Sequence, residues 1–294
     1  MSDASTIIKA ALAAHTMEQA MAVQAMITKA VGATYQRPIG DRWNNIGLLT
    51  RVGNTDHKLL ENVTNAQDAV LELIALQKFG SPDAVPYTTP HEAAGALLGH
   101  LPWQQAAQLV TVELHESNPP ARKSGRLTAI FKDAGVGMAP GYLSQSIFYL
   151  GSSHKGKAAW QQGAFGLGGA STFRHADAVS IVTRRHPDVL GPGEEDRIAV
   201  AVCIWEEFDK GSGIYYLTTK DWADGNNPTA EPWSALASAC PDVAPGTHLA
   251  LIAYQPDRAH NAAWGGEFSF ETFCEVKNVC VSLGGHPIPR WGVN

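Results

Sequence analysis

The chain has 294 residues, a formal charge of −6 and 17% charged residues, which suits one large or two modest domains with a sizeable core. The acidic balance disfavours nucleic acid as a partner of this chain alone. No apolar run approaches the roughly 18 to 20 residues that span a bilayer, and the N-terminus lacks the pattern of a secretory signal. We therefore expect a soluble, cytoplasmic protein with no membrane partner. Its four cysteines form no Cys-x-x-Cys pair, which favours reduced thiols over a zinc site or disulfides.

The first thirty residues are rich in alanine and methionine. Thr16 and Gln19 have the spacing of a capping box, which predicts a helix that ends near Gly32. We assign residues 1–39 to an N-terminal helical extension. Packing is the role that we expect for it, and a strap between two copies is the alternative.

A second predicted helix, from about residue 60 to 77, carries a polar face. Glu61, Asn65 and Asp68 stand at i, i+4 and i+7, so they share one side of the helix, while most of its apolar residues lie elsewhere. A carboxylate and an amide in such a position suit a general base and a ligand for a hard cation. The alternative is a solvated helix face that carries these residues by chance.

The remaining pattern predicts mainly antiparallel strands. Residues 80–108 contain four prolines in loop-like surroundings. Strands are expected at residues 109–114, 127–132, 178–183, 197–205, 213–218 and 248–254, the first two joined as a hairpin. Helices followed by such strands indicate an α+β fold.

Three further motifs combine glycine with polar residues. The first is Asp133-Ala134-Gly135-Val136-Gly137-Met138, where an acceptor-only carboxylate and two glycines permit a flat ligand to approach, or simply form a turn. The second is the glycine-rich run of residues 163–170, whose backbone N–H groups suit phosphates. The third is Gly246-Thr247, where the threonine is either a ligand contact or a β-branched residue that opens a strand.

Taken in order, the Glu-x-x-x-Asn-x-x-Asp-Ala helix and these three motifs resemble the nucleotide-binding motifs of the GHKL superfamily. Its members are the gyrase B subunit, the 90-kDa heat-shock chaperone, histidine kinases and MutL-type repair proteins. Because Ala69 follows Asp68 and no phosphoacceptor histidine box is present, the non-kinase branch is favoured. The resemblance implies the Bergerat fold, a two-layer sandwich of a mixed, mostly antiparallel sheet with helices on one face.

The resemblance also implies roles for individual residues. Glu61 would be the general base toward the water that attacks the γ-phosphate, Asn65 would hold Mg²⁺, and Asp133 would accept a hydrogen bond from the adenine amino group. Met138 would pack against the base, or is an ordinary core methionine. The residues so assigned to nucleotide binding are Asn65, Asp68, Asp133, Gly135, Gly137, Met138, Ser152, Lys155, Lys157, Gly163, Phe165, Gly166, Leu167, Gly168, Gly169, Ala170 and Thr247.

The segment before the glycine-rich run resembles the start of the lid in this superfamily. Thirty positions separate Asp133 from Gly163, so the lid looks short, which would limit closure and turnover. A rival interpretation is a P-loop, because residues 151–158 match Gly-x-x-x-x-Gly-Lys. However, Ala158 stands where a P-loop has the serine or threonine that binds Mg²⁺.

These observations predict an ATP-binding domain over residues 40–256, with residues 257–294 as its extension or the start of a following domain. The expected ligands are ATP or ADP and Mg²⁺. We expect slow hydrolysis of ATP to ADP and phosphate in a conformational or dimerisation switch, with a nucleotide-dependent homodimer as a possible assembly and a larger protein as the context. The alternatives are a non-hydrolysing adenine-nucleotide sensor and an interaction module.

Overall fold

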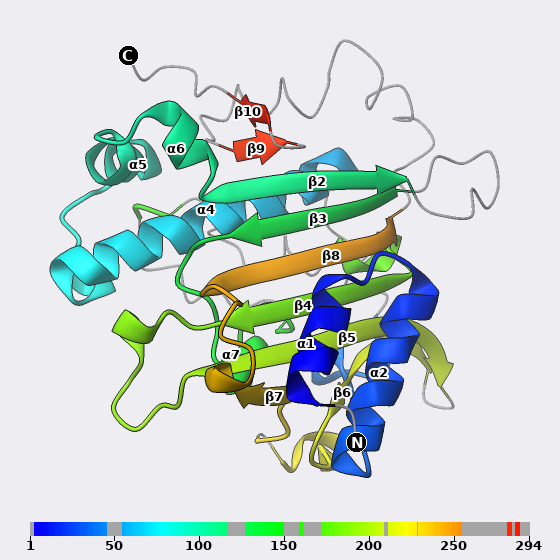
Figure 1. The fold of residues 1–294 in the computed structure, drawn as a ribbon. Coiled ribbons are helices and arrows are strands. Elements are labelled where there is room, and N and C mark those ends of the chain that lie inside the picture. The colour runs from blue at the N-terminus through cyan, green and yellow to red at the C-terminus, as the bar shows by residue number, and fades with distance from the viewer. Residues whose placement is uncertain are drawn as a thin grey trace.

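The computed structural model describes residues 3–45, 55–116, 127–149, 159–161, 172–208, 211–227, 229–254, 281–283 and 286–288. Within these ranges the chain is an α+β protein built on one mixed, mostly antiparallel sheet, as the sequence predicted (Figure 1). The strands are β1 (Tyr35–Pro38), β2 (Val110–Glu116), β3 (Leu127–Asp133), β4 (Ala178–Arg184), β5 (Arg197–Phe208), β6 (Gly211–Thr218), β7 (Trp233–Leu236), β8 (Gly246–Tyr254), β9 (Val281–Leu283) and β10 (His286–Ile288).

The sheet order is β1-β6-β5-β4-β8-β3-β2-β9-β10, with β7 also paired to β5. Among the described strands, the β2–β9 pair is parallel and every other pair is antiparallel. The six predicted strands are confirmed as β2, β3, β4, β5, β6 and β8, including the β2–β3 hairpin pairing. The order places β3, β8 and β4 side by side in the middle of the sheet.

The α-helices are α1 (Ala4–Leu12), α2 (Met17–Val31), α4 (Thr55–Phe79), α5 (Pro90–Leu98), α6 (Trp103–Ala107) and α7 (Pro140–Leu143). The predicted capping box is confirmed at α2, where the Gln19 backbone N–H donates to Thr16 Oγ1 and the Gln19 side chain accepts from the Thr16 N–H. Gly32 ends the helix with a φ of 83°, a conformation that glycine adopts at little cost. Tyr35–Pro38 then pairs with β6, so the helical part of the N-terminal region ends before residue 35.

The prediction that residues 80–108 are loop-like is wrong over two stretches, which form α5 and α6. Thr89 caps α5 by accepting the Glu92 N–H, and Pro90 occupies the first turn, where its missing N–H costs nothing. Pro102 similarly stands directly before α6. Pro90 and Pro102 thus stand at the starts of short helices, where proline is tolerated, so a proline-rich segment need not be a loop.

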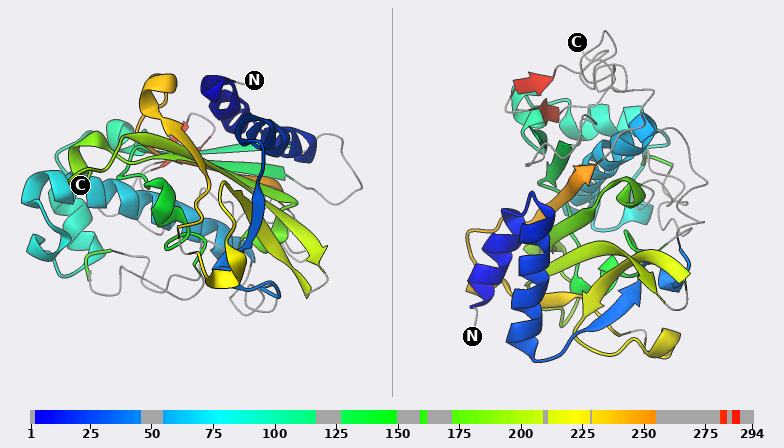
Figure 2. Two further views of the ribbon diagram at one scale, coloured as in Figure 1. Left: turned by 90° about the horizontal axis from the view of Figure 1, so that it is seen from below. Right: turned by 90° about the vertical axis from the view of Figure 1, so that its right-hand side faces the viewer.

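Helices cover both faces of the sheet, so the prediction of helices on one face only is wrong. Figure 2 shows α1 and α2 on one side of the strands and α4 on the other. Two apolar clusters correspond to these sides: one joins α1 and α2 to the sheet, and the other joins α4 to it. The expected packing role of the N-terminal region is therefore confirmed.

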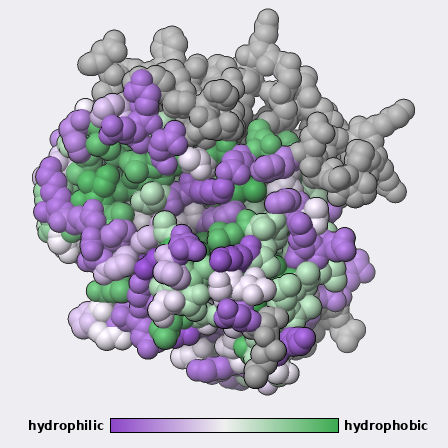
Figure 3. Space-filling model, viewed as in Figure 1, coloured by the Kyte–Doolittle hydropathy of each residue, from purple (hydrophilic) through white to green (hydrophobic). Residues whose placement is uncertain are grey.

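The burial of β4 explains why helices cover both faces of the sheet. Residues 178–183 are all buried, so side chains that point to opposite faces are both withdrawn from water. Ile181 belongs to the cluster under α4, and its neighbour Val182 belongs to the cluster under α1 and α2. In the same orientation as Figure 1, the surface mixes hydrophilic and hydrophobic residues, and the hydrophobic ones gather most clearly at the upper left, where Figure 1 shows α5 and α6 (Figure 3).

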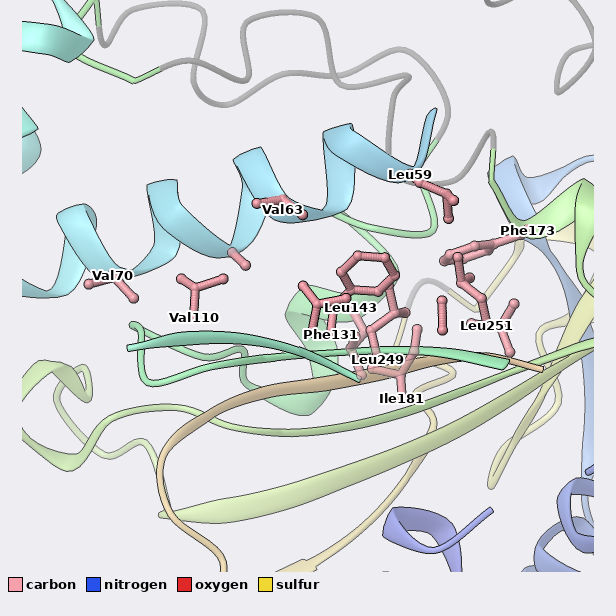
Figure 4. Packing of buried hydrophobic residues seen from close by; sticks show 14 of the residues in the cluster. Leu59, Val63, Val70, Val110, Phe131, Leu143, Phe173, Ile181, Leu249 and Leu251 are labelled. Atoms are coloured by element: carbon pink, nitrogen blue, oxygen red, sulfur yellow. The ribbon is translucent and has the colours of Figure 1, made fainter. Parts of the chain in front are cut away.

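Helix α4 confirms the second predicted helix and lies across the strands with its apolar side inward. Val63 and Val70 are buried and point toward the sheet, where Phe131, Ile181 and Leu249 lie close together (Figure 4). Burial of such side chains contributes about 1.5 to 3 kcal/mol each to folding. The polar side of α4 is thereby held in a fixed rotation about the helix axis.

Two further properties bear on the sequence predictions. Among the described helices, none is long and apolar enough to cross a membrane. Cys203 and Cys240 are buried free thiols, whereas Cys274 and Cys280 lie outside the described residues.

On the α1–α2 face, His248 of β8 is held in its neutral form. Burial, followed by the charge of Lys132 on β3, lowers the pKa of His248 to about 4; His15, before α2, also lowers it, and Glu113 on β2 partly opposes the shift. Its Nε2 atom is buried without a hydrogen-bond partner among the described residues. A proton on this imidazole would therefore be poorly accommodated.

The environment of His248 predicts that the folded chain is less stable in acid. The unfolded chain binds a proton at His248 below its ordinary pKa of 6.5, whereas the folded chain does so only near 4, so stability falls as the pH drops between these values. The loss from this group reaches roughly 2 kcal/mol at pH 5. His248→Leu should reduce the difference in urea midpoint between pH 7 and pH 5, and His100→Leu, at an exposed position, should not. Equal acid sensitivity in the His248 variant and wild type would contradict this assignment.

Candidate functional site

Three polar residues form a row across the centre of the sheet on the side covered by α4. In the strand register, Thr247 of β8 lies between Asp133 of β3 and Thr183 of β4. The next row on the same face is apolar and consists of Phe131, Leu249 and Ile181. The polar row therefore borders the buried apolar cluster under α4.

The loop after β3 closes around Asp133 through backbone hydrogen bonds. Asp133 Oδ1 accepts the Gly135 N–H at 2.9 Å and the Thr247 N–H at 3.3 Å. Gly246 has a φ of 120°, and a Cβ there would lie 2.0 Å from the carbonyl oxygen of Asp133. The Asp133 motif and the Gly246-Thr247 motif are thus brought together, with glycine required at their contact.

The same loop also touches α4. The Val136 N–H donates to the carbonyl oxygen of Ala69 at 2.9 Å, and a Cβ on Gly135 would lie 2.5 Å from the carbonyl carbon of Ala69. Gly137 adopts a φ of 60° against the backbone of Arg184. Ala69 follows Asp68 directly, so these backbone contacts fix the polar motif of α4 against the loop after Asp133. A side chain at Gly135 would disrupt them.

The predicted polar face of α4 runs from exposed to buried along the helix. Glu61 is exposed, Asn65 is partly buried, and Asp68 is fully buried. Glu72 continues the same side one turn further, at i+4 from Asp68, and is partly buried. The face therefore offers one carboxylate at the solvent and an amide oxygen next to it, and such oxygens are suitable ligands for Mg²⁺.

Both residues that border the glycine-rich segment contact α4. Gln161 Nε2 donates to Glu72 Oε2 at 3.1 Å, and Asn62 Nδ2 donates to Thr172 Oγ1 at 3.4 Å. These contacts lie near the two ends of the polar face of α4, from residue 61 to 72. The described residues on either side of residues 162–171 thus both contact this helix.

A tyrosine of α7 adds to the electrostatics at the Glu72 end. Burial, together with the negative charge of Glu72, raises the pKa of Tyr142, and Arg185 acts in the opposite direction. Met138 is partly buried, and its sulfur accepts a hydrogen bond from Ser146 at 3.2 Å. The thioether is thus held in place beside the apolar cluster under α4.

Several predicted site residues lie outside the described residues. These are Ser152, Lys155 and Lys157 of the lid, with the rival P-loop, and Gly163, Phe165, Gly166, Leu167, Gly168, Gly169 and Ala170 of the glycine-rich run. The other predicted site residues are described. On α4 lie Glu61, Asn65 and Asp68, and on β8 lies Thr247. At or just after the end of β3 lie Asp133, Gly135, Gly137 and Met138.

Sequence reasoning missed five polar residues at this place: Asn62, Glu72, Gln161, Thr172 and Thr183. Glu72 had a signal, because it continues the i, i+4 pattern from Asp68. Thr183 had none, since only the pairing of β4 with β8 brings it beside Thr247.

Comparison with known proteins gives no independent assignment. No family model matches the chain, and no curated protein matches it. Within the described ranges there is also no group of three or more histidine, cysteine, aspartate or glutamate residues that could hold a metal ion. Among the described residues of this side of α4, Asn65 carries a side-chain oxygen of the kind that binds Mg²⁺.

Proposed function

We propose that this chain binds ATP with Mg²⁺ and hydrolyses it slowly to ADP and phosphate. The observation that carries the proposal is the junction at Ala69, where the Val136 N–H meets the Ala69 carbonyl and brings the α4 motif against the loop that follows Asp133. The register of β3 and β8 adds Thr247 to the same place. Three of the four motifs that resemble those of the GHKL superfamily are thus neighbours in space, although they are far apart in the sequence.

In this proposal each part has a chemical role. Asp133 accepts a hydrogen bond from the adenine amino group, and the buried apolar row of Phe131, Leu249 and Ile181 supports the strands that carry this polar row. Asn65 provides an oxygen for Mg²⁺, which needs only one or two protein ligands when phosphates supply others. Glu61, exposed on the same side of α4, is the general base toward the attacking water.

The proposal extends to the fold and to the use of the nucleotide. Helix α4 and the strands that it covers would correspond to the Bergerat sandwich, with α1 and α2 as an added layer. The nucleotide would act as a conformational or dimerisation switch, which requires that the γ-phosphate bind the closed form preferentially. The chain would serve as the ATPase domain of a larger protein.

Calorimetric titration with ATP, with GTP and with the Asp133→Asn variant tests the site. Wild type should prefer ATP, and the variant should lose about 1 to 3 kcal/mol of ATP affinity because its amide presents a donor to another donor. Asp196→Asn is a suitable control, since Asp196 pairs with Arg184 and is not among the proposed ligand contacts. Unchanged ATP affinity in Asp133→Asn would mean that any nucleotide binds elsewhere.

A further inference from the structure

Thr183 is a buried threonine of β4 that lies at one end of the polar row, beside Thr247. Its Oγ1 atom accepts the Met138 N–H at 2.9 Å, lies 3.1 Å from the carbonyl oxygen of Gly246, and lies 3.2 Å from Thr247 Oγ1. One side chain thus connects the loop after β3 with both residues of the Gly246-Thr247 motif. Only 1% of Thr183 is exposed, so water does not compete for these contacts.

Counting protons determines the direction of each bond. A threonine hydroxyl has one proton and two acceptor positions. The Gly246 carbonyl can only accept, so the Thr183 proton belongs to it, and the Met138 N–H fills one acceptor position. The remaining acceptor position faces Thr247, whose hydroxyl must then donate to Thr183. In this arrangement all three partners of Thr183 are satisfied, which avoids the cost of a buried unpaired group.

We infer that Thr183 is a positioning residue that turns the Thr247 hydroxyl proton away from the ligand, so that Thr247 presents an acceptor beside Asp133. The base-reading edge then consists of acceptors from both residues. Such an edge selects a base with an exocyclic amino group and rejects one with a carbonyl at the same place. This inference rests on the proposed nucleotide site and assigns part of its specificity to a residue outside the four motifs.

ATP and ITP test this selectivity, because the base of ATP carries an exocyclic amino group at the position where the base of ITP carries a carbonyl group. Thr183→Val removes the acceptor that holds the Thr247 proton, which can then rotate and donate to the carbonyl of ITP. The ratio of ATP to ITP affinity should therefore fall roughly tenfold, the effect expected from reversing one hydrogen bond. Thr183→Ser retains the hydroxyl group and should keep the ratio of wild type, which a merely structural effect of the valine would not explain.

The Thr247→Val variant gives a second test that does not depend on the folding of Thr183→Val. If Thr247 is an acceptor, its removal weakens ATP more than ITP and the ratio falls; a ratio that rises would show that Thr247 donates and would overturn the inference. An unchanged ratio in Thr183→Val, in a protein that binds ATP, would also overturn it. Failure of wild type to bind ATP would instead refute the proposed function itself. Calorimetry with Mg²⁺ and each nucleotide measures all of these outcomes.

Discussion

Replacement of Glu61 by alanine is expected to slow ATP hydrolysis at least about a hundredfold and to leave ATP affinity near that of wild type. Glu61 is exposed on α4 and shares a helix side with Asn65 and Asp68, so its removal takes away a carboxylate without opening the core. Because a base acts in the transition state, turnover should fall while binding persists. Single-turnover hydrolysis and calorimetry on the same samples measure the two quantities.

Two further variants sharpen this experiment. Glu61→Gln keeps the size of the side chain but cannot take a proton, so it should lose turnover as fully as the alanine variant. Glu18→Ala, at an exposed position of α2, should retain the wild-type rate. If Glu61→Ala hydrolyses ATP as fast as wild type, the base assignment is refuted. If wild type binds ATP and never hydrolyses it, the chain is a sensor of adenine nucleotides.

Replacement of Gly135 by alanine is expected to destabilise the fold by about 3 kcal/mol and to weaken ATP binding. The added Cβ would lie 2.5 Å from the carbonyl carbon and 2.7 Å from the carbonyl oxygen of Ala69. These are backbone atoms of α4, and the Val136 N–H bond holds them in place, so the loop and helix must separate. Urea unfolding measures the first effect, and ATP titration of the folded variant measures the second.

Gly95→Ala is the matched control. Gly95 is exposed within α5, and an added Cβ there meets no atom within 4 Å. This substitution should raise stability by roughly 0.5 to 1 kcal/mol, since alanine favours a helix interior. A Gly135→Ala protein that unfolds at the urea concentration of wild type would show that the close contact between the loop and α4 is not required.

The sequence was sufficient to predict most of the long helices and strands and to predict which side of α4 carries the polar residues. The periodicity of α4, the capping box at Thr16 and the six strands all arise from local patterns. The second helical layer was missed, although the uninterrupted apolar run of β4 was a signal that both faces are covered. The short strands β1, β7, β9 and β10 have three or four residues each, too few for a clear period.

The candidate site was predictable only in part, for a physical reason. Asp133, Gly135 and Thr247 could be proposed because they stand in short glycine-containing motifs whose order along the chain is visible in the sequence. Thr183 looks like an ordinary β-branched strand residue, and its role depends on a pairing between β4 and β8 that joins residues 64 positions apart. Asn62 and Thr172, which approach each other across 110 positions, were invisible for the same reason.

The polar row depends on an alignment that no single strand determines alone. Side chains alternate along a strand, so a shift of β8 by one residue would move Thr247 among the aliphatic side chains under α1 and α2 and bring His248 beneath α4. Gly246 resists this shift, because any other residue at its place would collide with the carbonyl oxygen of Asp133. A one-residue deletion before Gly246 should therefore be tolerated, because it only shortens the loop. The same deletion inside β8 would move every side chain on one side of the deletion to the opposite face of the sheet. The register of β8 against β3, which Gly246 helps to hold, is thus as much a part of the site as the side chains that β8 carries.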